Sequence, residues 1–487
     1  NPARLPSGML TLDYANCLAD RVGAEDGIDP AHLSPDGSIA QRHRAHTEAL
    51  ESSRGAGWER WRLLAERGPT GMRDHHVEGV RRTAEKHAGR WENLVVLGIG
   101  GSALGNIALQ NALNPATHNL LPAGERRGPR VFVLDNVDPA NFEQVMRVCD
   151  PKSTLYNVIS KSGETAETAA QFMYIRDLLK RMVGGEAAEH IVAITDAEKG
   201  TMRSICDAEG YETLPVPDGV GGRFSVLSPV GLFSAAMGGI DLDALLDGAH
   251  AMEQRCRAPE LAQNPAGMLA ALLVHLGTGC YNEAGAAKPN HVLMPYCNAL
   301  YSMADWFRQL WAESLGKRVN TAGEEVFAGF TPIKALGATD QHSQIQLYRE
   351  GPNDKVIGFM EVEDFASSAE IPAGLGVEAI RYLECQPFAR LLNSEKRATE
   401  YALVESKRPN FTIRFPKVDA HHVGEFIMLW QVATAYAGRM LGIDAYDQPA
   451  VETGKKATFG LMGRDGYGAW REQVDGVLPA HDRVISG

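Results

Sequence analysis

Three of the hydroxyl side chains in the segment Ser160–Thr168 lie in its first six residues; the sequence of the segment is Ser-Lys-Ser-Gly-Glu-Thr-Ala-Glu-Thr. Ser160, Ser162 and Thr165, together with a glycine and free backbone N–H groups at a helix start, are donors that suit a terminal phosphate. The alternative is a plain helix cap with acidic residues in the first turn. A cap needs one hydroxyl, whereas this segment has three beside Lys161, so we predict a phosphate-binding loop.

A carboxylate and an arginine elsewhere in the chain suit acid–base chemistry. Glu313 lies four residues after Gln309 in a helical run, so both side chains share one helix face. Most helical glutamates are exposed, but two nearby tryptophans predict a buried carboxylate, and burial raises a carboxyl pKa toward the range of a general base. Arg223 follows two glycines and precedes an apolar helix, which favours a position inside a site.

Three further segments are ambiguous by themselves. Gly98–Gly105 (Gly-Ile-Gly-Gly-Ser-Ala-Leu-Gly) follows a strand and opens a helix, which suits either a structural turn or a ligand loop. It meets a loose dinucleotide-binding pattern, but Asp135, which ends the next strand, lies beyond the usual spacing of about 20 residues. His342 in a polar loop and Lys455 beside Lys456 are, alone, ordinary surface residues.

Alternating strand and helix patterns must position these segments. Short β-branched runs occur at Leu94–Leu97, Val131–Leu134, Leu155–Ile159, Ile191–Thr195, Val292–Met294 and Lys355–Val362. Strands separated by helices indicate βαβ units and parallel sheets that are covered on both faces. We therefore expect an α/β fold with two doubly wound parallel sheets, an N-terminal helical arm and a C-terminal helical segment.

The same patterns give domain boundaries. The expected parts are an N-terminal helical arm over 1–88, a first domain over 89–245, a helical connection over 246–285, a second domain over 286–445 and a C-terminal helical segment over 446–487. The arm shows helical runs such as Thr47–Arg67 and no strand signal. Long helical segments fill Asp241–Leu276 and Val423–Leu441.

Composition excludes several classes of protein. The chain has 487 residues, 44% of them hydrophobic and 22% charged, which is ordinary for a globular protein of about two or three domains. A net charge of −13 argues against a nucleic-acid partner. Seven scattered cysteines without a Cys-x-x-Cys pair favour reduced thiols in a cytoplasm over disulfides or a zinc site. No apolar stretch reaches the roughly 18 residues of a membrane span.

Taken together, the motifs resemble those of the glucose-6-phosphate isomerase family. Six occur in family order: GIGGS at Gly98–Ser102, SKSGET at Ser160–Thr165, GGRFSVLSPVG at Gly221–Gly231, QLWAESLGK at Gln309–Lys317, QH at Gln341–His342 and DQPAVETGK at Asp447–Lys455. The resemblance covers roughly residues 90–460. It implies two sugar isomerase (SIS) domains, a homodimer, no metal or cofactor, and interconversion of glucose 6-phosphate and fructose 6-phosphate through ring opening and a cis-enediol.

Matching positions carry the family's roles onto this chain. The resemblance implies that Glu313 moves a proton between C1 and C2 and that Arg223 stabilises the enediolate. It implies that His342, donated by the partner subunit, and Lys455 assist ring opening; Lys455 is preferred over Lys456 by the motif's spacing. The substrate-binding residues implied in the same way are Gly101, Ser102, Ser160, Lys161, Ser162, Thr165, Gln309 and Gln448.

Departures and alternatives stay open at this point. Glu164 stands where some members have Thr or Ser, which puts a carboxylate beside the predicted phosphate loop, and Pro449-Ala450 replaces other dipeptides. An isomerase of the same fold that also accepts mannose 6-phosphate, and a non-catalytic sugar-phosphate-binding protein, are the competing hypotheses. An NAD-dependent oxidoreductase would rest on the glycine loop alone.

Overall fold

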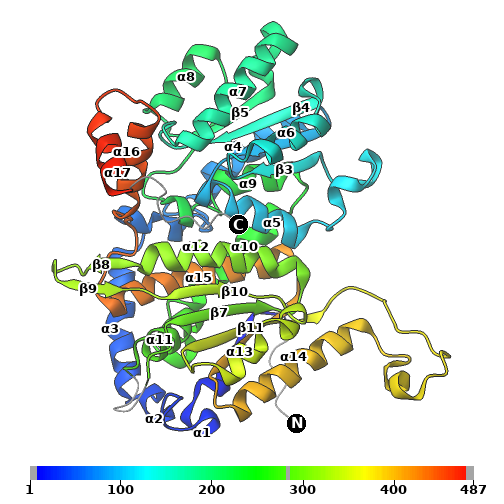
Figure 1. Cartoon of the computed structure of the whole chain (residues 1–487), viewed down its shortest axis with the longest axis vertical. Helices are drawn as coiled ribbons and strands as arrows, with labels where there is room; N and C mark the ends of the chain where they lie inside the picture. Colours follow the sequence, from blue (N-terminus) through cyan, green and yellow to red (C-terminus); the bar gives the residue numbers. More distant parts are fainter. Residues whose placement is uncertain (1–7, 281–285, 479–487) are drawn as a thin grey trace.

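Two lobes, each built around a five-stranded sheet, make up the chain (Figure 1). The computed structural model describes residues 8–280 and 286–478. The predicted arm, connection and C-terminal segment extend into residues 1–7, 281–285 and 479–487, which lie outside the described residues. Within the described ranges, no helix is long and apolar enough to cross a membrane. The predicted α/β class with two mainly parallel sheets is confirmed, and the domain boundaries stay a prediction.

The first sheet holds five parallel strands in the order β3-β2-β4-β5-β6. Their bounds are β2 Asn93–Leu97, β3 Arg130–Leu134, β4 Thr154–Ile159, β5 Ile191–Thr195 and β6 Glu212–Pro215. Leu94 of β2 lies beside Val131 of β3 on one side and Leu155 of β4 on the other. The chain passes from β2 to β3 on one side and then crosses back to β4 on the other, so the loops after β2 and β4 run in opposite directions. Open α/β sheets usually bind their ligands at such a point.

Helices cover both faces of this sheet because alternate strand residues point to opposite sides. Leu94 and Val96 join the larger apolar core, whereas Val95 and Leu97 join a second core. The helices that contribute to the larger core are α4 (Arg73–His87), α5 (Leu104–Leu113) and α9 (Pro229–Met237). Those on the second core are α6 (Pro139–Val148), α7 (Ala166–Met182) and α8 (Thr201–Glu209).

The second sheet has the order β1-β12-β11-β7-β10. Its strands are β1 Thr11–Asp13, β7 Asn290–Pro295, β10 Thr331–Lys334, β11 Lys355–Asp364 and β12 Asn410–Lys417. All neighbours are parallel except β1, which pairs antiparallel with β12. Its helices are α10 (Leu242–Arg255), α11 (Pro265–Thr278), α12 (Tyr301–Leu315), α13 (Ile345–Glu350), α14 (Phe388–Glu405) and α15 (Ala420–Leu441).

Two glycines let α10 and α15 pack backbone to backbone. A Cβ atom on Gly248 would lie 1.8 Å from the carbonyl oxygen of His421, and one on Gly424 would lie 1.9 Å from that of Leu245. No side chain fits at either position, because real Cβ atoms do not approach backbone so closely. This contact joins α10, which follows the first lobe, to α15, which follows the last strand of the second lobe.

The N-terminal region differs from the expectation of helices alone. Residues 11–13 form β1, and Thr11 of β1 lies opposite Arg414 of β12. The prediction that this region contains no strand was therefore wrong. The helices are α1 (Ala19–Val22), α2 (Pro30–Leu33) and α3 (Ser38–Ser53). The predicted run Thr47–Arg67 is also wrong as one helix: α3 ends at Ser53, Gly55 takes a φ of +75°, and a 3-10 helix follows over Gly57–Leu63.

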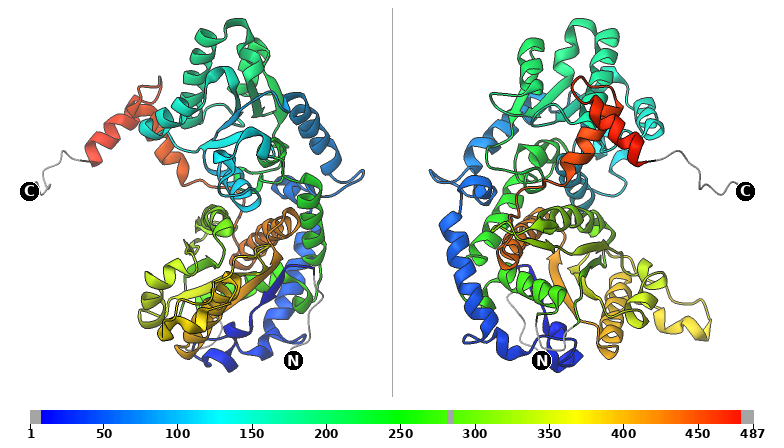
Figure 2. Two further views of the ribbon diagram at one scale, coloured as in Figure 1. Left: turned by 90° about the vertical axis from the view of Figure 1, so that its right-hand side faces the viewer. Right: turned by 60° about the vertical axis from the view of Figure 1, so that its left-hand side comes forward.

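The C-terminal helices lie beside the first lobe, although α15 belongs to the second (Figure 2). They are α16 (Val451–Leu461) and α17 (Gly468–Val477). Arg464, between them, forms an ion pair with Glu164 in the loop after β4, with 3.1 Å between nitrogen and oxygen. An unpredicted antiparallel hairpin of β8 (Lys317–Val319) and β9 (Glu325–Ala328) follows α12.

Candidate active site

A cavity of about 510 Å³ opens at the carboxyl ends of β2 and β4. This is the point where the strand order of the first sheet reverses. Six of the residues singled out in the sequence line it: Ser102, Ser160, Lys161, Ser162, Thr165 and Gln448. The glycine loop (Gly98–Gly105), the hydroxyl loop (Ser160–Thr165) and the C-terminal motif (Asp447–Lys455) therefore meet at one site.

The hydroxyl loop keeps its O–H groups available as donors. The Oγ atom of Ser160 accepts a hydrogen bond from the Gly163 N–H at 3.0 Å, and the Oγ atom of Ser162 accepts one from the Glu164 N–H at 3.2 Å. A hydroxyl that accepts in this way still carries a proton to donate. Thr165 is the N-cap residue of α7 and makes no side-chain capping bond, so its hydroxyl also remains available.

Glycine is required at the turn of this loop. Gly163 has a φ of +80°, and a Cβ atom there would lie 2.3 Å from the backbone nitrogen of Met202. Lys161 lines the cavity, but its Nζ atom lies 3.9 Å from an Asp218 oxygen and 5.6 Å from the ring centre of Trp58. The donors that this loop offers to an anion are therefore hydroxyl and backbone N–H groups, and the charge of Lys161 lies at the edge of the cavity.

The glycine loop after β2 brings two other segments into contact. A Cβ atom on Gly101 would lie 2.2 Å from the carbonyl carbon of Gly222, so the 3-10 turns Gly100–Ser102 and Gly222–Phe224 touch through backbone. Gly100 has a φ of +55°, and a Cβ atom there would lie 3.0 Å from Nε2 of Gln309 on α12. The loop thus sets the spacing between the turn that carries Arg223 and the helix that carries the carboxylate.

Arg223 is buried, with 4% of its surface exposed, and all three of its nitrogens are bonded. Nε donates to Oγ of Ser314 at 2.7 Å, and one terminal nitrogen donates to Oε1 of Gln448 at 2.8 Å. The other donates to the carbonyl oxygens of Ala445 at 2.6 Å and Asp447 at 3.1 Å. Burial lowers the pKa of the guanidinium, and the nearby carboxylates limit that effect. The result is a positive charge in a rigid position.

Glu313 faces this charge from α12. Its Oε2 atom accepts a hydrogen bond from Nε2 of Gln309 at 3.1 Å and lies 3.8 Å from a terminal nitrogen of Arg223. The side chain is 27% exposed, so the expectation of a buried carboxylate was wrong. The two tryptophans, Trp306 and Trp311, point into the apolar core instead of covering the carboxylate. A half-open carboxylate beside a fixed cation can both reach a substrate and exchange a proton with it.

A family model described as phosphoglucose isomerase matches residues 75–373. The chain belongs to the phosphoglucose isomerase family. A glucose-6-phosphate isomerase of Carboxydothermus hydrogenoformans is 44% identical over 402 residues, which cover 82% of this chain and 85% of that protein. One of Thermus thermophilus is 39% identical over 411 residues, covering 82% and 92%. The resemblance found in the motifs is thereby confirmed over most of the chain.

Solved structures agree with this family. A hypothetical protein of Thermus thermophilus has a TM-score of 0.81 and 35% identity, and the match covers 93% of this chain and all of that one. A glucose-6-phosphate isomerase of Chlamydia trachomatis has a TM-score of 0.75 at 23% identity, over 91% and 88% of the two chains. The second match shows a shared fold.

The family motifs imply two further catalytic residues, and both lie apart from Glu313, Arg223 and the hydroxyl loop. His342 is exposed in the 3-10 turn Thr339–His342, and its loop is held by Asp340, whose carboxylate accepts from the Leu336 N–H at 2.6 Å. Lys455 on α16 is 55% exposed and donates to Glu452 at 2.8 Å. Within the described ranges, no hydrogen bond or ion pair links either side chain to Glu313, Arg223 or the hydroxyl loop.

Sequence reasoning missed two residues of this candidate site. Ser314 supplies the oxygen that binds Nε of Arg223. Lys317 donates to the backbone oxygens of Glu313 at 3.0 Å and Ser314 at 2.9 Å, and burial lowers its pKa. It thereby binds the end of α12 and lies 3.6 Å from Asp447. Both residues were in the QLWAESLGK motif, but neither had an assigned role, because the partners that join them to the rest of the site, Arg223 for Ser314 and Asp447 for Lys317, are far away in the sequence.

Across the part of the chain that is described, no group of three or more His, Cys, Asp or Glu side chains is arranged to hold a metal ion.

Proposed function

We propose that this chain interconverts glucose 6-phosphate and fructose 6-phosphate. The observation that carries the proposal is the pairing of a partly exposed carboxylate, Glu313, with the buried charge of Arg223 at 3.8 Å, beside a cavity whose lining includes the three side chains of the hydroxyl loop. Moving a proton from the carbon next to a carbonyl to the carbonyl carbon itself needs one base and one fixed positive charge. Membership of the phosphoglucose isomerase family supports the same conclusion.

The proton moves between C2 and C1 of the open-chain sugar. The carboxylate of Glu313 takes the C2 proton of the aldose, and the electrons left behind form an enediolate whose negative charge lies on the former carbonyl oxygen. Arg223 stabilises that oxygen without moving, because its own position is set by Ser314, Gln448 and two backbone carbonyls. The protonated Glu313 then returns the proton to C1 while the C2 hydroxyl passes its own proton to the oxygen on C1. A carbonyl forms at C2, which gives the ketose, and the carboxylate of Glu313 is restored.

Substrate is held at its phosphate end. Ser160, Ser162 and Thr165 donate hydrogen bonds to the phosphate oxygens, and the N-terminus of α7 adds a favourable dipole. Gly101 and Ser102 contact the sugar. Binding energy from the phosphate, which does not react, helps to hold the reacting carbons against the base.

Hydroxyl positioning and ring opening use further residues. Gln309 and Gln448 position the sugar hydroxyls; the hydrogen bonds of Gln309 with Glu313 and of Gln448 with Arg223 support this role. Lys455 and a histidine, His342, assist ring opening, and His342 comes from the second subunit of a homodimer. The exposure of His342 on a loop that is well held within its own subunit supports donation to a neighbour.

A cytoplasmic location is part of the same proposal. All seven cysteines are free thiols, and five of them are buried. Unpaired buried thiols are typical of a reducing compartment.

A parallel assay of several substrates tests the proposed reaction. Fructose 6-phosphate, mannose 6-phosphate and glucosamine 6-phosphate are offered separately, with and without EDTA, and the formation of each isomer is followed. We expect turnover of fructose 6-phosphate that EDTA does not change. Comparable turnover of mannose 6-phosphate would instead support the dual isomerase, and binding without turnover would support the non-catalytic alternative.

A further inference from the structure

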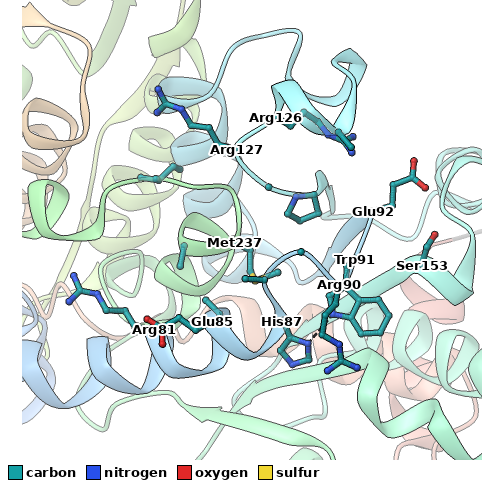
Figure 3. Close-up of a pocket in the computed structure, with 18 of the residues that line it drawn as sticks. Arg81, Glu85, His87, Arg90, Trp91, Glu92, Arg126, Arg127, Ser153 and Met237 are labelled. Atoms are coloured by element: carbon teal, nitrogen blue, oxygen red, sulfur yellow. Dashed lines mark hydrogen bonds between the residues drawn. The ribbon is translucent and has the colours of Figure 1, made fainter.

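A second and larger cavity, of about 820 Å³, lies at the opposite end of the first sheet from the candidate active site. Figure 3 shows the side chains that line it. The end of α4, the turn 88–92, the loop before β3 and the end of α9 form its walls. Strand β2 runs between the two sites, from Glu92 at this cavity to the glycine loop at the other. Five strand residues span about 16 Å, so the two cavities are separate.

The cavity has an apolar and rigid floor. Met237, Ile240 and Leu242 contribute apolar surface, although each is more than nine-tenths buried. Trp91 is held in place because its Nε1 donates to Nδ1 of His87 at 2.9 Å. With Nδ1 accepting, the other ring nitrogen of His87 carries the proton and faces Glu212 at 3.1 Å. A floor of this kind exists before a ligand arrives, as small-molecule sites usually do.

Most charged side chains at the rim already have a partner. Arg81 pairs with Asp243, and Arg90 pairs with Glu189 at 2.6 Å and covers the Trp91 ring. Glu92 lies 3.2 Å from Arg130, which is outside the cavity. The charges of these side chains are already neutralised by their partners, so they give no indication of a bound ligand.

Two neighbouring arginines are the exception. Arg126 and Arg127 line the cavity from the loop before β3, and neither forms an ion pair with any residue in the described ranges. The Nε atom of Arg126 is buried without a hydrogen-bond partner. Glu85 is the acidic residue of the rim that has no ion pair of its own among the described residues. The unpaired charge at the rim is therefore positive overall, in a chain whose net charge is −13.

We propose that this cavity binds an organic anion with an apolar body, whose carboxylate or phosphate group is held by Arg126 and whose body packs on Trp91 and Met237. Arg127, whose side chain points to the other side of the loop in Figure 3, adds positive charge at the rim. Guanidinium groups match carboxylate and phosphate oxygens in paired hydrogen bonds. The cavity volume lies within the range of about 300–1,000 Å³ for small-molecule sites. A bare sugar phosphate does not suit it, because the apolar floor would desolvate sugar hydroxyls without bonding them.

Binding of small probes to the whole protein tests this proposal. Isothermal titration calorimetry with phenyl phosphate and with 4-phenylbutyrate offers the two anionic groups on an apolar body. Inorganic phosphate and phenol offer the anion and the body alone. We expect at least one of the two organic anions to bind at least tenfold more tightly than inorganic phosphate or phenol. The tighter binder of the two shows whether the cavity prefers a phosphate or a carboxylate. Binding of inorganic phosphate as tight as that of phenyl phosphate would overturn the proposal.

Variants then locate the bound probe. Arg126→Met/Arg127→Met should weaken binding at least tenfold, and Arg127→Met alone, at an exposed position, should weaken it without affecting the fold. Arg44→Met, which removes an exposed arginine of α3, is the matched control and should bind as the parent protein does. Circular dichroism and thermal melting verify that each variant is folded.

A further variant separates the two cavities. Ser162→Ala/Thr165→Ala alters the hydroxyl loop and should leave probe binding at the second cavity unchanged. Loss of binding in this pair, or unchanged binding in both arginine variants, would place the probe in the active site or elsewhere and would contradict the proposal. Absence of binding by both organic anions at millimolar concentration would contradict it as well. Because the test measures binding of non-substrates, it does not depend on the proposed isomerase activity.

Discussion

Arg223→Lys is expected to damage both catalysis and stability, because the arginine serves two purposes. Its three nitrogens make four hydrogen bonds, to Ser314, Gln448 and the carbonyls of residues 445 and 447. A lysine retains the charge but has one nitrogen on a shorter, flexible stem, so it can reach only part of this set. The charge then no longer sits where the enediolate oxygen develops.

The two effects have different magnitudes. Losing two of the four charge-assisted bonds, at ~1.5–3 kcal/mol each, should lower the free energy of unfolding by ~3–6 kcal/mol. Misplacing one preorganised charge that stabilises an oxyanion costs ~10²–10³-fold in kcat. KM should change much less, because the charge acts mainly on the transition state.

The assay couples glucose 6-phosphate production to an NADP-dependent dehydrogenase and is run beside a urea denaturation series. Arg44→Lys, at an exposed position of α3, is the control for a change of arginine to lysine and should match the parent in both measurements. A kcat within about threefold of the parent, together with a large loss of stability, would refute the reasoning. Arg223 would then be a structural residue that bonds the loops around the cavity and does not act on the substrate.

Three further perturbations test other parts of the site. Ser162→Ala/Thr165→Ala should raise KM for glucose 6-phosphate with a smaller loss of kcat, because it removes two phosphate donors. Gly101→Ala should lower kcat at least tenfold, since its Cβ atom would lie 2.2 Å from backbone in the opposite turn and would push the two turns apart. Mixing inactive His342→Ala and Glu313→Gln subunits should restore about a quarter of the parent activity, because half of the dimers are mixed and each has one intact site.

Each of these outcomes has a control. Unchanged kinetics in the serine and threonine variant would make that loop a plain helix cap. Gly124→Ala is the control for Gly101→Ala and should leave kcat unchanged, because a Cβ atom at Gly124 meets nothing within 4 Å. No recovery after proven subunit exchange would place His342 in the site of its own subunit or outside catalysis.

Strands whose signal is local were predictable from the sequence. The predicted Ile191–Thr195 coincides with β5, and Leu155–Ile159 lies within one residue of β4, because both strands are buried along their whole length and rich in β-branched residues. The short β6 was missed, since it mixes polar and apolar residues. Strand β1 was also missed, because β12, the strand with which it pairs, is about 400 residues away in the sequence.

The site shows the same limit. The hydroxyl loop, Gln309 and Glu313 were recognisable because each motif lies on one continuous segment. The hydrogen bonds of Arg223 join residues 91 and 225 positions apart, and only the tertiary fold brings them together. The burial of Glu313 was overestimated for a related reason: helical spacing places tryptophans near it in sequence but does not say which face meets the core.

Solvent deuterium exchange in the Glu313→Gln variant tests the central claim most directly. The amide retains the shape of the carboxylate and its bond with Gln309 but cannot accept the C2 proton. In deuterium oxide, the parent should place deuterium at C2 of glucose 6-phosphate formed from fructose 6-phosphate. The variant should bind substrate, lose about 10²–10⁴-fold in rate and incorporate no deuterium above background. Exchange at the parent rate in the folded variant would show that another group moves the proton and would contradict the account.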